Sequence, residues 1–168
     1  KIDYTPIDGE VIDLERFAKL GGQGVLLLMA DSTNVERPGF TISEKVIGEN
    51  LKKIFYKAEG RIIVASFASN IHRIQQIANA AIFYGRKIAF SGRSMERISE
   101  IAMNLGYLHI PEEAIVTVAD LHNYPDNKVT IVTTGSQGEP LAALTRMASN
   151  THRSIQIQKG DLIILSAS

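Results

Sequence analysis

The chain of 168 residues contains no cysteine, so it can form neither disulfides nor thiolate metal sites, and a cytosolic location is the default expectation. It also lacks an excess of either charge, because 18 lysine and arginine residues balance 18 aspartate and glutamate residues. A net charge of zero argues against a domain that binds RNA or DNA through bulk charge, although a neutral domain can carry a local basic groove. No segment is apolar enough to span a membrane. No signal peptide is recognisable, and since the first residue is Lys1, we expect a fragment of a longer protein.

Familiar catalytic and metal-binding patterns are missing too. The histidines show neither the i, i+2 nor the i, i+4 spacing of paired ligands, and no carboxylate completes a set around them. They are His72, His109, His122 and His152. We therefore expect no metal site within this chain, and we expect His109 and His122 to be loop or surface residues. The sequence has no G-x-S-x-G elbow, no P-loop and no G-x-G-x-x-G fingerprint, so no complete catalytic set is present. This pattern fits part of an enzyme better than a whole one.

What the chain does contain is a regular alternation of apolar runs and amphipathic segments. The apolar runs predict buried strands at 25–29, 62–64, 87–90, 129–133 and 162–165. Apolar residues at helical spacing predict helices at about 14–20, 42–58, 70–84, 95–105 and 141–148. The alternating stretch Thr151–Gln158 predicts an edge strand or a hairpin arm. This order favours an α/β fold over a single domain, 1–168, with a parallel, Rossmann-like sheet and helices on both of its faces.

Capping residues predict where several of these helices begin and end. We expect Asp13, Ser69 and Ser94 to be N-caps, and the stretch Thr41–Glu44 fits a capping box. The pair Gly21–Gly22 predicts the end of the first helix. Lys1–Tyr4 is interpreted as the tail of a strand that begins earlier in a longer chain.

Five predicted strands end in short stretches of small and polar residues. These strand exits are 30–34, 67–70, 91–94, 134–139 and 166–168. In a parallel sheet the carboxyl ends of all strands lie at one edge, and open α/β sheets bind their ligands at that edge. The coincidence of five such exits predicts a ligand-binding edge.

The stretch Arg61–Ile77 carries the first anion-binding pattern. It predicts a strand that enters a helix through the polar turn before Ser69, with His72 and Arg73 in the first helical turn. Free backbone N–H groups and the positive end of the helix dipole favour a phosphate at such a position. The alternative is an ordinary strand-to-helix turn with a satisfied cap.

The stretch Gly135–Glu139 carries the second pattern, because two glycines allow close approach of an anion to successive N–H groups. Its alternative is a plain turn before a helix. Arg93 follows another strand and could bind a phosphate with both arms of its guanidinium group, although a lone arginine there is more often part of a surface ion pair. Asp31 directly follows an apolar run, where a carboxylate either caps a turn or takes part in chemistry.

Several stretches, in this order, support a family resemblance. They are Lys1–Pro6, Ala30–Asn34 with Glu36–Pro38, Phe67–Arg73, Gly92–Met95 and Thr134–Pro140. Together they resemble bacterial ribonuclease J in its β-CASP domain, an α/β insert within a nuclease of the metallo-β-lactamase type. The resemblance covers essentially the whole chain.

The resemblance implies an enzyme that cuts RNA at a two-zinc site, as an endonuclease and as a 5′→3′ exonuclease. The family's zinc ligands lie in the metallo-β-lactamase domain, on motifs such as H-x-H-x-D-H that are absent here, so we expect the fragment alone to be inactive. The implied cofactor of the full-length enzyme is zinc. The implied partners are the 5′-monophosphate end of RNA and the metallo-β-lactamase domain of the same protein. No association with a membrane is expected. Whether the full-length protein forms homo-oligomers stays open.

The resemblance also implies roles for individual residues. Asp31 matches the acidic first motif of the β-CASP group, which lies near the metal site and supports it, so it is the expected catalytic residue. Three of the strand exits would face the cleft between the two domains, where the 5′-monophosphate end of RNA is held. The expected RNA- or phosphate-binding residues are Ser69, Asn70, His72, Arg73, Arg93, Ser94, Gly135, Ser136, Gln137, Gly138 and Glu139.

Two other functions are compatible with parts of the pattern. One is a free-standing nucleotide- or sugar-phosphate-binding enzyme of the Rossmann type, against which the missing fingerprint and the lack of an acidic residue placed to hold a ribose both argue. The other is a β-CASP insert of a DNA-acting nuclease. The fold does not decide between RNA and DNA, but the matching stretches favour the RNA enzyme.

Overall fold

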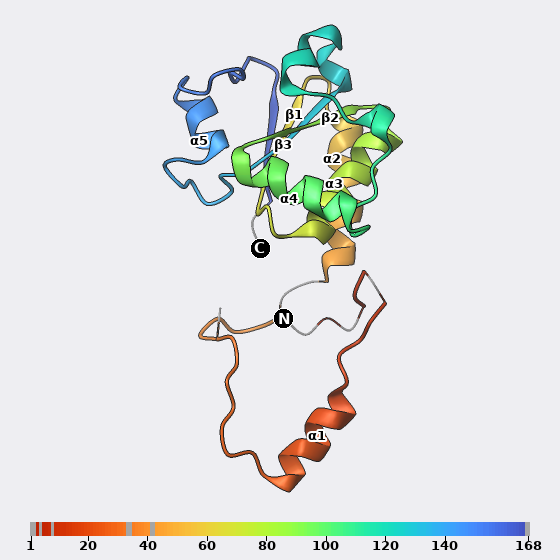
Figure 1. The fold of residues 1–168 in the computed structure, drawn as a ribbon, viewed down its shortest axis with the longest axis vertical. Coiled ribbons are helices and arrows are strands. Elements are labelled where there is room, and N and C mark those ends of the chain that lie inside the picture. Colours follow the sequence, from red (N-terminus) through yellow and green to blue (C-terminus); the bar gives the residue numbers. More distant parts are fainter. Residues whose placement is uncertain (1–2, 4, 8, 33–34, 41–42, 167–168) are drawn as a thin grey trace. The chain divides into compact units, whose positions relative to one another are not determined.

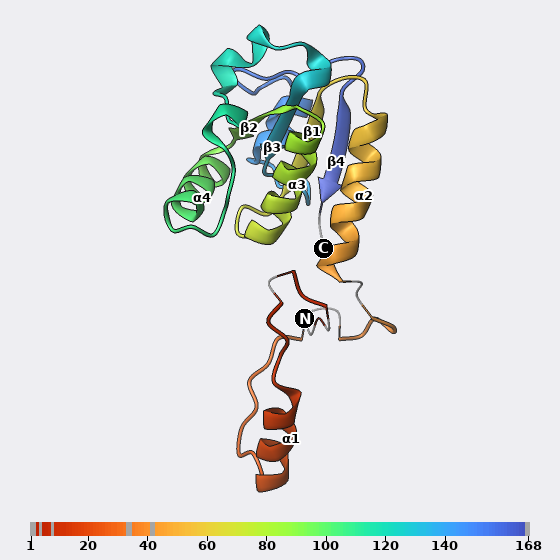
Figure 2. The same cartoon turned by 90° about the vertical axis from the view of Figure 1, so that its right-hand side faces the viewer.

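A computed structural model describes residues 3, 5–7, 9–32, 35–40 and 43–166 of the chain. The chain divides into two compact units, residues 1–46 and residues 47–168 (Figures 1 and 2). Within the described ranges no helix is long and apolar enough to cross a membrane.

The first unit contains the helix α1 (Leu14–Gln23). Asp13 caps it as expected, because its carboxylate accepts a hydrogen bond of 2.9 Å from the Arg16 N–H. The helix continues through Gly21 and Gly22, so the predicted end was wrong. It stops instead at Gly24, whose φ of 87° lies in the left-handed region that glycine tolerates best.

The predicted strand 25–29 is absent, and this expectation was wrong. Its side chains are 57–104% exposed, and no described residue of the first unit pairs with its backbone. An apolar run indicates that a segment belongs in a buried setting, but a strand also needs a neighbour for its hydrogen bonds. The predicted strand tail at Lys1–Tyr4 and the Thr41 side of the predicted capping box lie outside the described residues.

The second unit is built on a parallel sheet of four strands. They are β1 (Ile62–Ser66), β2 (Lys87–Ser91), β3 (Val129–Thr133) and β4 (Leu162–Ser166). Their order across the sheet is β2-β3-β1-β4, and all three pairings are parallel. The predicted α/β class and four of the five predicted strands are therefore confirmed.

Helices cover both faces of this sheet. They are α2 (Glu44–Lys57), α3 (Ile71–Phe83), α4 (Arg93–Asn104) and α5 (Ala143–Ala148), with short 3₁₀ turns at Glu112–Ala114, Val118–Asn123 and Asp126–Lys128. Figure 2 shows α2, α3 and α4 along one face, and Figure 1 shows α5 on the other. Helix α5 starts two residues later than the sequence predicts, because the backbone at Ala142 is still extended.

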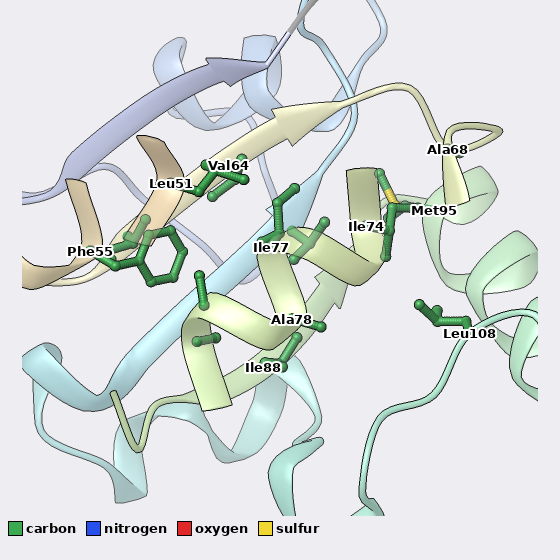
Figure 3. Packing of buried hydrophobic residues seen from close by; sticks show 14 of the residues in the cluster. Leu51, Phe55, Val64, Ala68, Ile74, Ile77, Ala78, Ile88, Met95 and Leu108 are labelled. Atoms are coloured by element: carbon green, nitrogen blue, oxygen red, sulfur yellow. The ribbon is translucent and has the colours of Figure 1, made fainter. Parts of the chain in front are cut away.

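The strand side chains alternate between two hydrophobic clusters, one on each face of the sheet. On one face, Ile62 and Val64 pack with Phe55 of α2 and Ile77 of α3 (Figure 3). On the other face, Ile63 and Ala65 pack in a second cluster that includes Met147 of α5. All five residues of β1 are buried, which explains why its sequence is apolar from Ile62 to Ala65, before the terminal Ser66.

The stretch Thr151–Gln158 forms no strand, so that prediction was wrong. Its alternation is real at Ile155, which is buried against the α5 side of the sheet, but the backbone is bent. The cause of the bend is His152, whose Nδ1 accepts hydrogen bonds from the Ser154 and Ile155 N–H groups at 3.3 and 3.1 Å.

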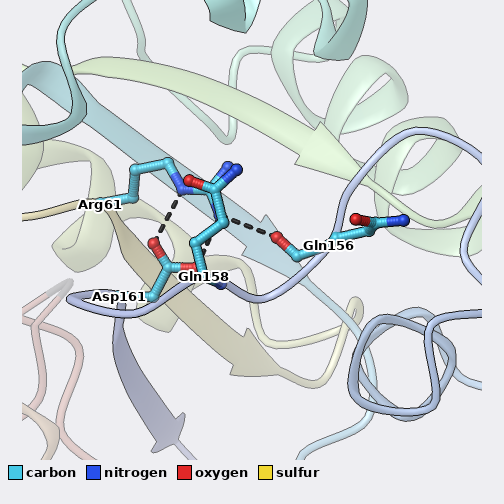
Figure 4. A network of polar contacts seen from close by, with 4 residues as sticks. All are labelled: Arg61, Gln156, Gln158 and Asp161. Atoms are coloured by element: carbon cyan, nitrogen blue, oxygen red, sulfur yellow. Dashed lines mark hydrogen bonds and ion pairs between the residues drawn. The ribbon is translucent and has the colours of Figure 1, made fainter.

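An ion pair ties together the starts of the two strands β1 and β4. The Arg61 guanidinium donates to both carboxylate oxygens of Asp161, at 2.8 and 2.6 Å, and to the Gln156 carbonyl (Figure 4). The hydrogen bonds that Arg61 donates to Asp161 raise the pKa of Arg61. Asp161 also accepts a hydrogen bond from the Gln158 N–H. Charge-assisted hydrogen bonds therefore link the starts of β1 and β4 at the amino edge of the sheet.

Candidate functional site

A row of buried hydroxyl groups marks the carboxyl edge of the sheet. Each strand ends in a serine or threonine, and the register pairs Ser66 with Ser166 and Ser91 with Thr133. These four residues are at most 8% exposed. The Ser66 hydroxyl has no hydrogen-bond partner among the described residues. Four of the five predicted strand exits thus share one edge, as expected.

The turn between β1 and α3 is capped by Asn70 and not by Ser69, so the predicted cap was wrong by one residue. The Asn70 side chain accepts from the Arg73 N–H at 3.1 Å. Ser69 and His72 are exposed beside this helix start. Because Asn70 satisfies the helix, the Ser69 hydroxyl is not needed for capping.

Arg73 lies behind this turn and not on its surface. Arg73 is 2% exposed, and its guanidinium group donates a hydrogen bond to the Ser166 hydroxyl at the end of β4. A charged group is buried at high cost unless it is hydrogen-bonded. Arg73 is therefore placed to hold the Ser166 hydroxyl at the carboxyl edge from the buried side of the sheet.

The turn after β2 brings Arg93 and Ser94 to the first turn of α4. The N-cap is Gly92 and no side chain caps the helix, so the predicted Ser94 cap was wrong. Gly92 has a φ of 108°, and a Cβ there would lie 3.2 Å from the Thr134 hydroxyl. Glycine is required at this crossing, which places Arg93 next to the loop after β3.

That loop, Thr134–Ala142, forms a tight turn in which Gly138 N–H donates to the Gly135 carbonyl at 3.2 Å. The Glu139 carboxylate accepts from the Gln137 N–H at 3.1 Å. Ser136 is 6% exposed, and its hydroxyl has no hydrogen-bond partner among the described residues. The turn thus contains a buried hydroxyl without a partner among the described residues, and one of its N–H groups is already bound to a carboxylate of the same turn.

Sequence reasoning assigned His152 no place in this site. Its Nε2 lies 3.2 Å from the Ser91 hydroxyl, while Nδ1 accepts from two backbone N–H groups. This arrangement requires a neutral ring whose Nε2–H donates to Ser91. Burial, and then the nearby charge of Arg146, lower the pKa of His152. A single histidine in an alternating stretch carried no signal of this role.

Comparison with known proteins adds a family to this geometry. Residues 59–168 match the family model described as ribonuclease J, β-CASP domain. The chain belongs to the ribonuclease J family. This confirms the predicted resemblance and favours neither alternative function.

Curated relatives in the ribonuclease J family match over nearly the whole chain. Ribonuclease J of Helicobacter pylori strain J99 is 49% identical over 99% of the chain, which spans 24% of that protein. Ribonuclease J 1 of Streptococcus pyogenes is 51% identical over 100% of the chain, and ribonuclease J2 of Bacillus subtilis 44% over 99%. The chain spans 30% of each of these two. It therefore corresponds to about a quarter to a third of a ribonuclease J.

Asp31, the residue matched to the family's acidic motif, is exposed in the first unit and follows no strand. The prediction that it sits at a strand exit of the sheet was wrong. Thr33 and Asn34, from the same motif, lie outside the described residues. The described residues contain no group of three or more histidines and carboxylates that could hold a metal ion.

Proposed function

We propose that this chain is the RNA-binding β-CASP part of a zinc-dependent ribonuclease that cuts RNA internally and degrades it 5′→3′. Membership of the ribonuclease J family supports the proposal. The observation that carries it is the carboxyl edge of the sheet, where buried hydroxyls of Ser66 and Ser136 have no partner among the described residues. In this proposal zinc is bound elsewhere in the longer protein, and Asp31 supports that metal site.

The proposed ligand of the edge is the 5′-monophosphate end of RNA. The exposed side chains of Ser69 and His72 stand at the start of α3, where the helix dipole favours negative charge. A terminal monophosphate carries more acceptor oxygens and more charge than a 5′-hydroxyl, so it gains more from these groups. Arg73 contributes from within, by holding Ser166 in place.

In this proposal the loop after β3 also binds the RNA phosphate, which replaces the Glu139 carboxylate as the acceptor of a backbone hydrogen bond. The Glu139 carboxylate accepts the hydrogen bond of the Gln137 N–H. A phosphate that binds this N–H must displace the carboxylate, because two negative groups at one donor repel each other. The proposal places the enzyme in the cytoplasm, where RNA substrates are present, and joins this chain to the metallo-β-lactamase domain of the same protein.

The test uses the full-length enzyme with Ser69→Ala and His72→Ala combined. Exonuclease rates are measured on 5′-monophosphorylated and 5′-hydroxyl RNA of one sequence. The ratio of the two rates should fall at least about tenfold, because charge-assisted hydrogen bonds to the phosphate are lost. Internal cleavage, which needs no free 5′ end, should change less.

The matched control is the pair Ser154→Ala and His122→Ala, which alters exposed residues of the same types outside α3 and the turn before it. It should leave the ratio unchanged. An unchanged ratio in the Ser69 and His72 variant, with both rates lowered together, would remove the start of α3 from the phosphate site.

A further inference from the structure

A cleft opens beside the carboxyl edge, between α4 and the segment 134–146. Its volume is about 1250 Å³, which exceeds the usual size of a small-molecule site and far exceeds what one phosphate fills. It adjoins the edge at Arg93 and Glu139, and from there it extends along α4 to Ile101. We call it the α4–α5 cleft.

Three arginines line the α4–α5 cleft. Arg93 and Arg97 lie one turn apart on α4, and Arg146 comes from α5. None of the three guanidinium groups has an ion-pair or hydrogen-bond partner among the residues that the structure describes, and the Arg146 Nε is buried without one. The lining has a single carboxylate, Glu139. The lining of the cleft therefore carries a net positive charge.

Apart from Gly92 and the hydroxyl residues Ser94 and Thr134, the rest of the lining is aliphatic. Leu141 is 87% exposed and Ile101 is 45% exposed, and both border the cleft. The lining has no aromatic side chain. An aliphatic surface can cover the flat face of a base but discriminates little between bases, and arginine can stack on bases as well as pair with phosphates.

We propose that the α4–α5 cleft binds nucleotides of single-stranded RNA downstream of the 5′ end, with phosphates on Arg97 and Arg146 and a base against Leu141 and Ile101. This deepens the proposed function and rests on it. The cleft continues from the edge proposed for the 5′ phosphate, and its charge and aliphatic surface match the two halves of a nucleotide. The binding is independent of base identity.

The experiment measures the affinity of full-length protein for 5′-hydroxyl oligoribonucleotides of increasing length, with cleavage suppressed by a chelating agent. The absence of a 5′ phosphate removes the contribution of the edge. Arg97→Ala combined with Leu141→Ser should weaken binding of the longer RNAs about tenfold and reduce the slope of log affinity against log salt by about 0.7. The shortest RNAs should be affected least.

Arg153→Ala is the matched control, since Arg153 is exposed and lies outside the cleft. Thermal melting verifies that each variant is folded. Unchanged affinity and unchanged salt slope in a folded Arg97 and Leu141 variant would overturn the inference. The preference for 5′-monophosphate, measured in the same proteins, should stay as in the parent. If the Arg97 and Leu141 variant lost only the preference for 5′-monophosphate and kept the length dependence, this assignment of the cleft would also be overturned. A parent protein without any such preference would instead contradict the proposed function.

Discussion

Arg73 shows how one side chain can serve the site without touching its ligand. It is one of two arginines that are almost fully buried in the described part of the chain, and it donates a hydrogen bond to the Ser166 hydroxyl at the edge. The other, Arg86, donates to the carbonyls of Ala58, Gly60 and Val129 at the opposite end of the sheet. Arg73 thus stabilises the carboxyl edge of the sheet, and Arg86 stabilises the amino edge.

Arg73→Ala should lower the free energy of unfolding of the chain by about 2–4 kcal/mol, because it leaves a cavity and an unpaired hydroxyl. Arg73→Met retains most of the volume and should lose less. Arg93→Ala, at an exposed position, should stay within about 0.5 kcal/mol of the parent. Urea denaturation measures all three. A parent-like stability of Arg73→Ala would show that the guanidinium does not hold the edge.

Single residues also mark the limit of sequence reasoning. Ser69 and Asn70 are both good N-cap residues, and only the backbone turn decides that Asn70 takes the role. Arg73 follows a strand exit, which suggests a surface contact, but helical geometry turns it toward β4. Local pattern predicted the right turn and the right residue types, and tertiary packing decided which of them are exposed.

At the scale of elements, the bent segment after α5 depends on a neutral His152. Protonation of Nδ1 would break its bonds with two backbone N–H groups. The pKa of His152 is lowered by burial and by Arg146, and Glu96 opposes this in part. The unfolded chain, with an ordinary histidine pKa near 6.5, therefore takes up this proton before the folded chain does.

The contribution of His152 to stability should be fully present above about pH 6.5 and should decline as the pH falls below it. His152→Gln should be less stable at pH 7.5 and should show a weaker loss of stability between pH 7 and about pH 5. His122→Gln, at an exposed histidine, is the control and should keep the parent's pH dependence. Urea denaturation at several pH values measures this. A variant as pH-sensitive as the parent would mean that His152 is not the titrating group.

Elements were predictable where hydrophobic pattern and burial agree. The strand β1 is buried at every position and apolar at all but its last residue, and α3 has its apolar residues against it. The segment 25–29 has the same apolar character but no strand beside it among the described residues of its unit. The segment 151–158 alternates correctly, but the hydrogen bonds of His152 bend it. Neither the missing neighbour nor the side-chain bond is visible in a local pattern.

At the scale of the whole molecule, one edge of the sheet gathers residues from distant parts of the sequence. Ser66, Ser91, Thr133 and Ser166 meet there because the sheet is parallel and in register. The expectation of one domain over 1–168 stays a prediction. The family model covers 59–168, and the first unit, with Asp31, lies before that range.

The most direct test of the central claim is the affinity of the full-length protein for two RNAs that differ only at the 5′ end. Cleavage is suppressed with a chelating agent, the salt concentration is fixed, and 5′-monophosphorylated and 5′-hydroxyl RNA are compared. We predict that the monophosphorylated RNA binds at least about tenfold more tightly, and that Ser136→Ala, which removes the buried unpaired hydroxyl, reduces this difference. Equal affinities for the two RNAs would contradict the assignment of this edge to the 5′ phosphate.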